Sequence, residues 1–196
     1  MHAAIGIYLD AVRTVCPKLS AAALDALAGR LTVSERRRHE IYIQPGQVQE
    51  EAGFVVRGLV RSYYLDQDGT ARTVRFYAEQ DYAVHYSAFI ARQPSKYAFQ
   101  CLEPVTMVGL PYHAMQWAYE AFPQFEQYGR LMAEAVLQAQ QARIESFLFQ
   151  TAEARYLGFI AQYPEIFSRI SLSHLCSYLG IERQTLTRIR QKLARS

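Results

Sequence analysis

Residues 172–193 read LSHLCSYLGIERQTLTRIRQKL, and this stretch decides how the C-terminal part of the chain folds. Leu175 and Leu179 have the spacing of one helical face, and the small Cys176 between them lets a second helix cross closely. Gly180 can adopt the positive φ of a tight turn, and Ile181 would fill the space under that turn. The second helix would turn three apolar residues inward: Leu186, Ile189 and Leu193. The stretch therefore predicts a helix-turn-helix motif.

The opposite face of the second predicted helix is polar and carries no acidic side chain, since Glu182 falls at the helix start. Arginine can bridge guanine O6 and N7, and glutamine can bridge adenine N6 and N7. The face contains Gln184, Thr187, Arg188, Gln191 and Arg195, with Arg183 beside it. We predict base contacts from Arg183, Gln184, Thr187 and Arg188, and phosphate contacts from Ser173, His174, Arg190 and Lys192. For His174, a solvated surface histidine is the alternative.

The charge distribution points to the same segment. Residues 151–196 hold seven Lys or Arg against three acids, a net charge of +4, whereas the first 150 residues carry −1. A polyanion such as double-stranded DNA is the natural partner of such a segment, although a solvated basic tail would have the same charge.

Short strands and turns fill the middle of the chain. The turn residues Gln44-Pro45-Gly46 and Asp66-Gln67-Asp68-Gly69 separate runs rich in β-branched and aromatic residues. These runs predict strands within 41–43, 54–65, 73–77, 82–84, 97–102 and 106–110. Frequent turns between short strands are typical of a β-sandwich or β-roll.

Helical spacing marks the remaining segments. We expect short helices over 19–31, capped by Ser20, and over 114–119, and a helix over 151–163 that Pro164 stops. Residues 164–169 would be a connector.

The segment 125–149 predicts a long helix with two apolar arcs. One arc runs from Phe125 to Phe147, and the other is formed by Leu137, Ile144 and Leu148. Two arcs imply two partners, the β-roll and the same helix of a second subunit; deeper burial within one monomer is the alternative.

The predicted fold class is α+β, in three parts: a jelly-roll-like β-roll sensor domain over 1–122, a dimerisation helix over 123–150, and a helix-turn-helix DNA-binding domain over 151–196. We expect a homodimer in the cytoplasm. Cys16, Cys101 and Cys176 are dispersed and read as reduced thiols, and the sequence has neither a signal peptide nor an apolar run that could span a membrane.

Enzyme signatures are missing from the sequence. The five histidines form no HExxH or cupin-like ligand set, and no Gly-x-Ser-x-Gly elbow or phosphate-binding glycine loop occurs. We therefore expect no catalysis, no metal and no cofactor.

The chain resembles the cyclic-AMP receptor protein/FNR family of transcription regulators. The resemblance rests on Gly58, the Asp68-Gly69 turn, residues 76–81, the long helix before 150, Glu153-Ala154-Arg155-Tyr156, and residues 178–190. It implies a cyclic-nucleotide-binding-like β-roll, a dimer, and RNA polymerase as a further partner. The family's base-contacting positions fall on Arg183, Gln184 and Arg188. Because the sequence given stops soon after the second helix, we expect no β-hairpin wing.

The phosphate cassette of the family's cyclic-nucleotide binders is altered here. Its first part reads Tyr82-Ala83-Val84-His85-Tyr86-Ser87, without the expected Gly and Glu, and its Arg is replaced by Lys96, which lacks the bidentate fork. The lone Cys16 near the N-terminus also argues against an iron–sulfur cluster. An unknown effector would contact His85, Tyr86, Ser87, Lys96 and Tyr97. The alternatives are a polar loop with no ligand, a cyclic-nucleotide-responsive regulator using Lys96, and a ligand-binding module that does not bind DNA.

Overall fold

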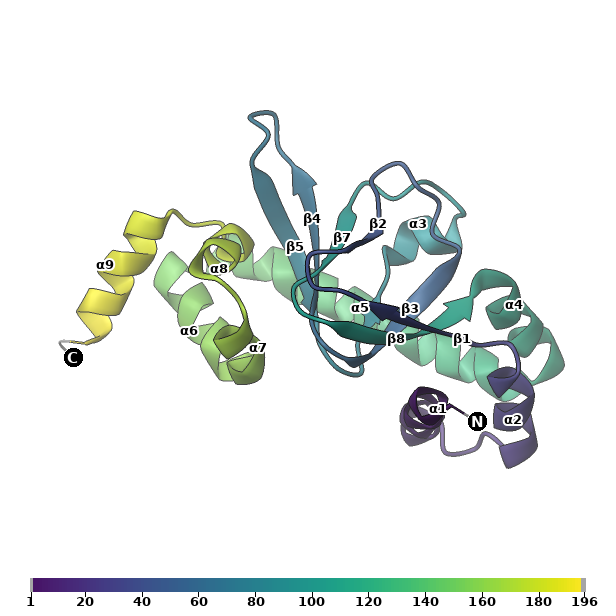
Figure 1. Cartoon of the computed structure of the whole chain (residues 1–196). Helices are drawn as coiled ribbons and strands as arrows, with labels where there is room; N and C mark the ends of the chain where they lie inside the picture. The colour runs from purple at the N-terminus through teal and green to yellow at the C-terminus, as the bar shows by residue number, and fades with distance from the viewer. Residues whose placement is uncertain (1, 195–196) are drawn as a thin grey trace.

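Two four-stranded antiparallel sheets form the centre of the computed structural model, which describes residues 2–194 (Figure 1). One sheet has the order β1-β8-β3-β6 and the other β2-β7-β4-β5. The strands are β1 (Thr32–Arg36), β2 (Ile41–Ile43), β3 (Glu51–Arg57), β4 (Val60–Leu65), β5 (Ala71–Tyr77), β6 (Tyr82–Ala83), β7 (Ala98–Cys101) and β8 (Val105–Pro111). Side chains from both sheets, including Ile43, Val55, Phe99 and Met107, form one buried cluster, so the sheets face each other as a β-roll.

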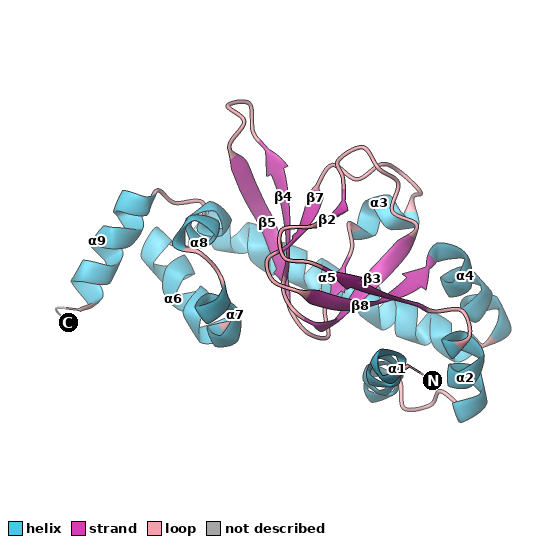
Figure 2. Cartoon of the chain, in the orientation of Figure 1, coloured by secondary structure: helices cyan, strands magenta, loops and turns pink. Residues whose placement is uncertain are grey.

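Helices from both ends of this region cover the β1-β8-β3-β6 sheet. Tyr8, Leu24 and Phe125 belong to one buried cluster with Phe54 and Val108 of the sheet. The helices involved are α1 (Ala3–Val15), α2 (Ala21–Ala28), α4 (Tyr112–Ala121) and the start of α5 (Pro123–Phe149). The short α3 (Tyr86–Ile90) lies between β6 and β7 along the chain. Figure 2 shows the strands in magenta at the centre, with helices in cyan on both sides of them.

The predicted strands and most predicted helices are confirmed. Ser20 caps α2 as expected, its hydroxyl accepting a hydrogen bond from the Ala23 N–H at 3.1 Å. Three elements were not predicted, α1, β1 and α3, and a fourth stands where a connector was predicted. β1 is a polar edge strand without a fully buried residue, and α3 has only five residues, so neither has a strong apolar period. The predicted connector over 164–169 is wrong, because these residues form helix α7 (Pro164–Arg169) with proline in its first turn.

The long helix α5 has its fully buried residues at one end only. Phe125 and Tyr128, both in its first two turns, are its only buried residues among those described. Leu137, Ile144 and Leu148 are 64%, 60% and 69% exposed. The second apolar arc is therefore uncovered in the monomer, and the alternative of deep burial within one chain is wrong.

The C-terminal helices dock on the β-roll through an aromatic contact and a strand edge. They are α6 (Ala152–Gln162), α7, α8 (Leu172–Leu179) and α9 (Arg183–Leu193). The ring of Phe76 on β5 lies 6.2 Å from Phe159 and 5.4 Å from Tyr178. Ser177 accepts a hydrogen bond from the Thr73 N–H at 2.7 Å and donates one to the Ala71 carbonyl at 3.0 Å. Because β5 is an edge strand, Ser177 satisfies backbone groups that the sheet leaves unpaired.

A charged contact ties α7 to the same domain. Arg169 donates to Glu79 at 2.9 and 3.0 Å and also pairs with Glu103. Burial alone would raise the pKa of Glu79, but hydrogen bonds from Arg169 and the Gly58 N–H outweigh it and lower that pKa to about 2. Glu79 therefore stays ionised and joined to α7 at neutral pH.

Replacing Arg169 by Met should lower the free energy of unfolding at pH 7 by about 1–2 kcal/mol, since charged hydrogen bonds contribute more than neutral ones but solvent screens these partly exposed partners. The pKa of Glu79 is depressed on folding, so its contribution is complete above about 4.5 and is lost as the pH falls towards about 2. Urea unfolding at several pH values should show the difference between the two proteins shrinking across that window. Arg13→Met, on the exposed side of α1, is the control. Equal stability of all three proteins at pH 7 would contradict the role of Arg169.

Candidate nucleic-acid interface and ligand cavity

The two helices of the predicted motif meet through a left-handed glycine. Gly180 has φ 65° and ψ 40°, and the Ile181 N–H donates to the Cys176 carbonyl at 3.1 Å, which closes the turn after α8. A Cβ on residue 180 would lie 2.7 Å from the ring of the partly exposed Phe147, which would have to shift, so the positive φ is the main reason for glycine here. The predicted inner faces are confirmed, with the following residues buried: Leu175, Cys176, Leu179, Leu186 and Ile189; Leu193 is partly buried.

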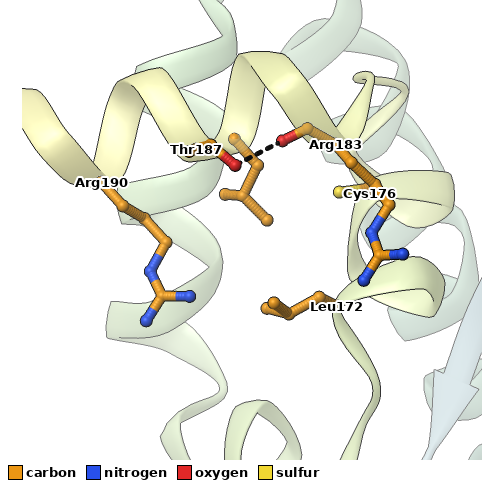
Figure 3. A pocket seen from close by; sticks show the side chains of 6 residues that line it. Leu172, Cys176, Arg183, Thr187 and Arg190 are labelled. Atoms are coloured by element: carbon orange, nitrogen blue, oxygen red, sulfur yellow. Dashed lines mark hydrogen bonds between the residues drawn. The ribbon is translucent and has the colours of Figure 1, made fainter.

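The outward face of α9 is exposed along its whole described length, and its side chains form two rows. Gln184, Arg188 and Gln191 lie opposite the buried stripe by helical spacing. Arg183, Thr187 and Arg190 instead line a groove of about 260 Å³ between α9 and α8, floored by apolar side chains (Figure 3). Thr187 donates its hydroxyl proton to the Arg183 carbonyl at 3.0 Å. The four predicted base readers thus come together on one helix but face two directions.

Of the four predicted phosphate contacts, three are exposed, one of them in an ion pair, and the fourth is half-buried. Ser173 and Arg190 are exposed. His174 is half-buried; burial first, then the nearby Arg61 and His39, lower its pKa to about 4, so it is uncharged at neutral pH. Lys192 pairs with Glu153 of α6 at 2.7 Å, a neighbour that the sequence argument did not include. Arg195 lies outside the described residues.

Two arginines from earlier helices hold the C-terminal end of α8, and sequence reasoning missed this role. Arg143 of α5 donates to the Tyr178 carbonyl and lies 3.7 Å above the Tyr178 ring. Arg155 of α6 donates from Nε to the Leu179 carbonyl at 3.0 Å. Both acceptors are end carbonyls of a helix, for which cations are favourable partners. Arg155 sits in the Glu-Ala-Arg-Tyr motif, which was the available sequence signal, whereas nothing nearby in sequence marks Arg143.

A cavity of about 700 Å³ lies where α5 separates from the β-roll. His85, Tyr86, Ser87 and Tyr97 of the predicted effector set line it, but Lys96 is exposed and does not. The His85 ring packs 4.5 Å from the Tyr97 ring, and its Nδ1 lies 3.3 Å from the Ser95 hydroxyl. Burial first, then Lys96, lowers the pKa of His85 and favours the neutral ring.

A buried glutamine supports this loop and was not predicted. The Gln49 side chain donates to the Ala83 carbonyl at 3.0 Å and accepts from the His85 N–H at 3.2 Å. The Ala83 carbonyl and the His85 N–H are therefore already hydrogen-bonded within the protein, and Lys96 is exposed outside the lining of the cavity.

Among residues 2–194, no cluster of three or more His, Cys, Asp or Glu side chains could hold a metal ion. Cys16, Cys101 and Cys176 are buried and free. No helix in the described part of the chain is both long and apolar enough to cross a membrane.

Comparison with known proteins shows the fold. Residues 34–122 match the family described as the cyclic nucleotide-binding domain. FixK2 from Bradyrhizobium japonicum is 18% identical, with 84% of each chain covered and a TM-score of 0.72. For the c-di-GMP responsive global regulator CLP from Xanthomonas campestris, identity is 12%, coverage 89% of this chain and 92% of that one, and the TM-score 0.70. The Thermus thermophilus Catabolite Activator Protein is 16% identical, with 92% of this chain and 86% of that one covered, and the TM-score is 0.57. Curated proteins give no significant match.

These findings define the class of structure: a cyclic nucleotide-binding-type β-roll joined to a C-terminal helical unit. More particularly, the chain has the fold of Crp/Fnr-type regulators such as FixK2 and the Catabolite Activator Protein. The predicted β-roll and the resemblance are thus confirmed at the level of fold.

Proposed function

We propose that this protein is a sequence-specific, DNA-binding transcription regulator that acts as a homodimer under the control of a small effector. In this proposal residues 1–122 sense the effector, 123–150 dimerise, and 151–196 bind DNA as a helix-turn-helix domain. The acid-free, exposed face of α9 is the observation that carries the proposal. It assigns no catalytic step to the chain. A cytoplasmic location and contact with RNA polymerase remain predictions from the resemblance.

The geometry of α9 suits insertion into a major groove. Gln184 and Arg188 project directly outward, where an amide and a guanidinium can each make paired hydrogen bonds to base edges. Arg183 and Arg190 flank the side nearer α8 and could reach either a base or the adjacent phosphates. Base reading therefore rests most firmly on Gln184 and Arg188, with Arg183 and Thr187 next to them.

Phosphate contacts must come from fewer residues than the sequence indicated. A neutral His174 brings no charge to a phosphate, and Lys192 would have to leave Glu153. Ser173 and Arg190 keep their exposed positions. Since phosphate contacts supply affinity without sequence information, a single copy of this unit should bind weakly, and a dimer should bind far better.

The exposed arc of α5 provides the surface for that dimer. Leu137, Gln141, Ile144 and Leu148 follow the 4-3-4 spacing of a two-helix seam. A row of leucine and isoleucine more than half exposed is unfavourable in a monomer, and a second copy of the same helix would cover it.

Replacing Arg188 by Ala should weaken the free energy of binding to a specific DNA site by about 1–3 kcal/mol. It should also relax the base preference at one position of that site. Gel-shift titration on a selected site and on a scrambled one measures both effects. The control is Arg13→Ala, which removes one positive charge far from α9. If Arg188→Ala and the control discriminate equally between the two sites, Arg188 does not read a base. If the unmodified protein shows no salt-dependent DNA retention, the ligand-binding module without DNA binding is the better description.

The double substitution Leu137→Glu with Leu148→Glu should convert a dimer into a monomer, because it places like charges along the seam. Size-exclusion chromatography with light scattering measures the mass of each protein. Gln138→Glu adds one negative charge to the same helix away from the arc and should stay dimeric. An unmodified protein that is monomeric at micromolar concentration, or a double variant that remains dimeric, would refute this interface.

A further inference from the structure

We propose that the cavity between α5 and the β-roll binds an uncharged, largely aromatic or aliphatic organic molecule bearing one hydrogen-bonding oxygen. The inference rests on the proposed function, since it names the chemical class of the effector. Three features of the cavity carry it: its walls, the pairing of its charged groups, and a cluster of tyrosine hydroxyls at one end.

The walls are predominantly apolar. Aromatic rings of β5, α3 and α6 line the cavity, among them Phe76, Phe89 and Phe159, and α5 contributes Met132, Val136 and Ala139. A volume of about 700 Å³ falls in the range of small-molecule sites, which are mostly apolar with few polar groups. An apolar ligand would replace water along these walls and so gain the free energy of apolar burial.

The charged side chains of the described lining are already engaged. They are Arg75, Asp81 and Arg143. Arg75 and Asp81 form an ion pair at 3.0 Å, and Arg143 donates to the Tyr178 carbonyl. An anionic ligand would have to break one of these contacts or enter without a counter-charge, and both options are costly in a partly buried site.

Three tyrosine hydroxyls meet where α1, β6 and α5 come together, and all three tyrosines line the cavity. Tyr82 donates to Tyr8 at 3.1 Å, and the Tyr82 and Tyr128 oxygens lie 2.9 Å apart. Since Tyr82 has a single proton, Tyr128 donates to it, and the Tyr8 proton has no acceptor within the cluster. Burial raises the pKa of all three, that of Tyr128 to about 12, so the cluster stays neutral. It can thus donate one hydrogen bond to a ligand oxygen.

A ligand in the cavity would also affect the proposed DNA-binding unit, because the cavity extends to the contact that holds α8. The same lining includes Arg143 and Tyr178, the pair that holds the end of α8 next to the Gly180 turn. A ligand packed against α5 would stabilise this arrangement by mass action, because it binds the folded state alone.

The test uses N-phenyl-1-naphthylamine, a neutral aromatic fluorophore, with the full-length protein. We expect saturable binding, displacement by 2-naphthol, a higher melting temperature with 2-naphthol, and no displacement by cyclic AMP. Ala139→Phe fills the cavity from α5 and should weaken binding of the fluorophore by about tenfold or more. Ala142→Phe is the matched control, since Ala142 is exposed on the same helix outside the cavity. If Ala139→Phe does not fold, Ala135→Phe, also in the lining, replaces it.

Three results would overturn the inference. The fluorescence could fail to saturate, the filling and control variants could bind the fluorophore with equal affinity, or cyclic AMP could displace it more readily than 2-naphthol does. DNA retention is measured on the same proteins. Loss of DNA binding with intact fluorophore binding contradicts the proposed function alone, whereas DNA binding without saturable fluorophore binding contradicts the ligand class alone.

Discussion

The structure depends on how α5 leaves the β-roll. Phe125 and Tyr128 anchor its first turns, and the following five turns run on without burying a further residue in their own chain. At 1.5 Å per residue the helix is roughly 40 Å long, so its far end reaches beyond the roll to the C-terminal unit. One face then borders the cavity, another exposes Leu137 and Leu148, and Ile144 is exposed at the edge of the cavity. Arg143, near the end of the helix, holds α8. A single helix therefore borders the cavity, carries the exposed apolar arc and holds α8, and under the proposed function it would position ligand, partner and DNA-binding helices together.

The contacts that hold the C-terminal helices on the β-roll leave the outward face of α9, with Gln184 and Arg188, exposed. Ser177 and Tyr178 bind α8 to β5, and Arg169 binds α7 to Glu79 and Glu103. All of these contacts lie on α7 or α8, whereas Gln184 and Arg188 remain exposed. The described arrangement therefore leaves Gln184 and Arg188 exposed, while His174 is half-buried and the exposed Lys192 is paired with Glu153.

The sequence was sufficient where local patterns are strong. Spacing and residue type predict the buried stripes of α8 and α9, the positive φ of Gly180 and the second arc of α5. The stripes are Leu175 with Leu179 and Leu186 with Ile189. It was insufficient where contacts join distant segments. Three such contacts join residues 39, 35 and 36 positions apart, and no local sequence pattern predicts them: Lys192 with Glu153, Arg143 with Tyr178, and Gln49 with His85. The outward position of Lys96 likewise depends on how the loop before β7 is packed.

Under the proposed function, two copies of α9, held by α5, read DNA together. DNA bound by the protein can be selected from a random pool, with and without cell extract as a source of effector. We expect an inverted repeat whose half-sites lie about one helical turn apart, since a two-fold dimer imposes its symmetry on the site. If neither condition enriches a sequence, or if only single half-sites without two-fold symmetry are enriched, the two copies do not read DNA together.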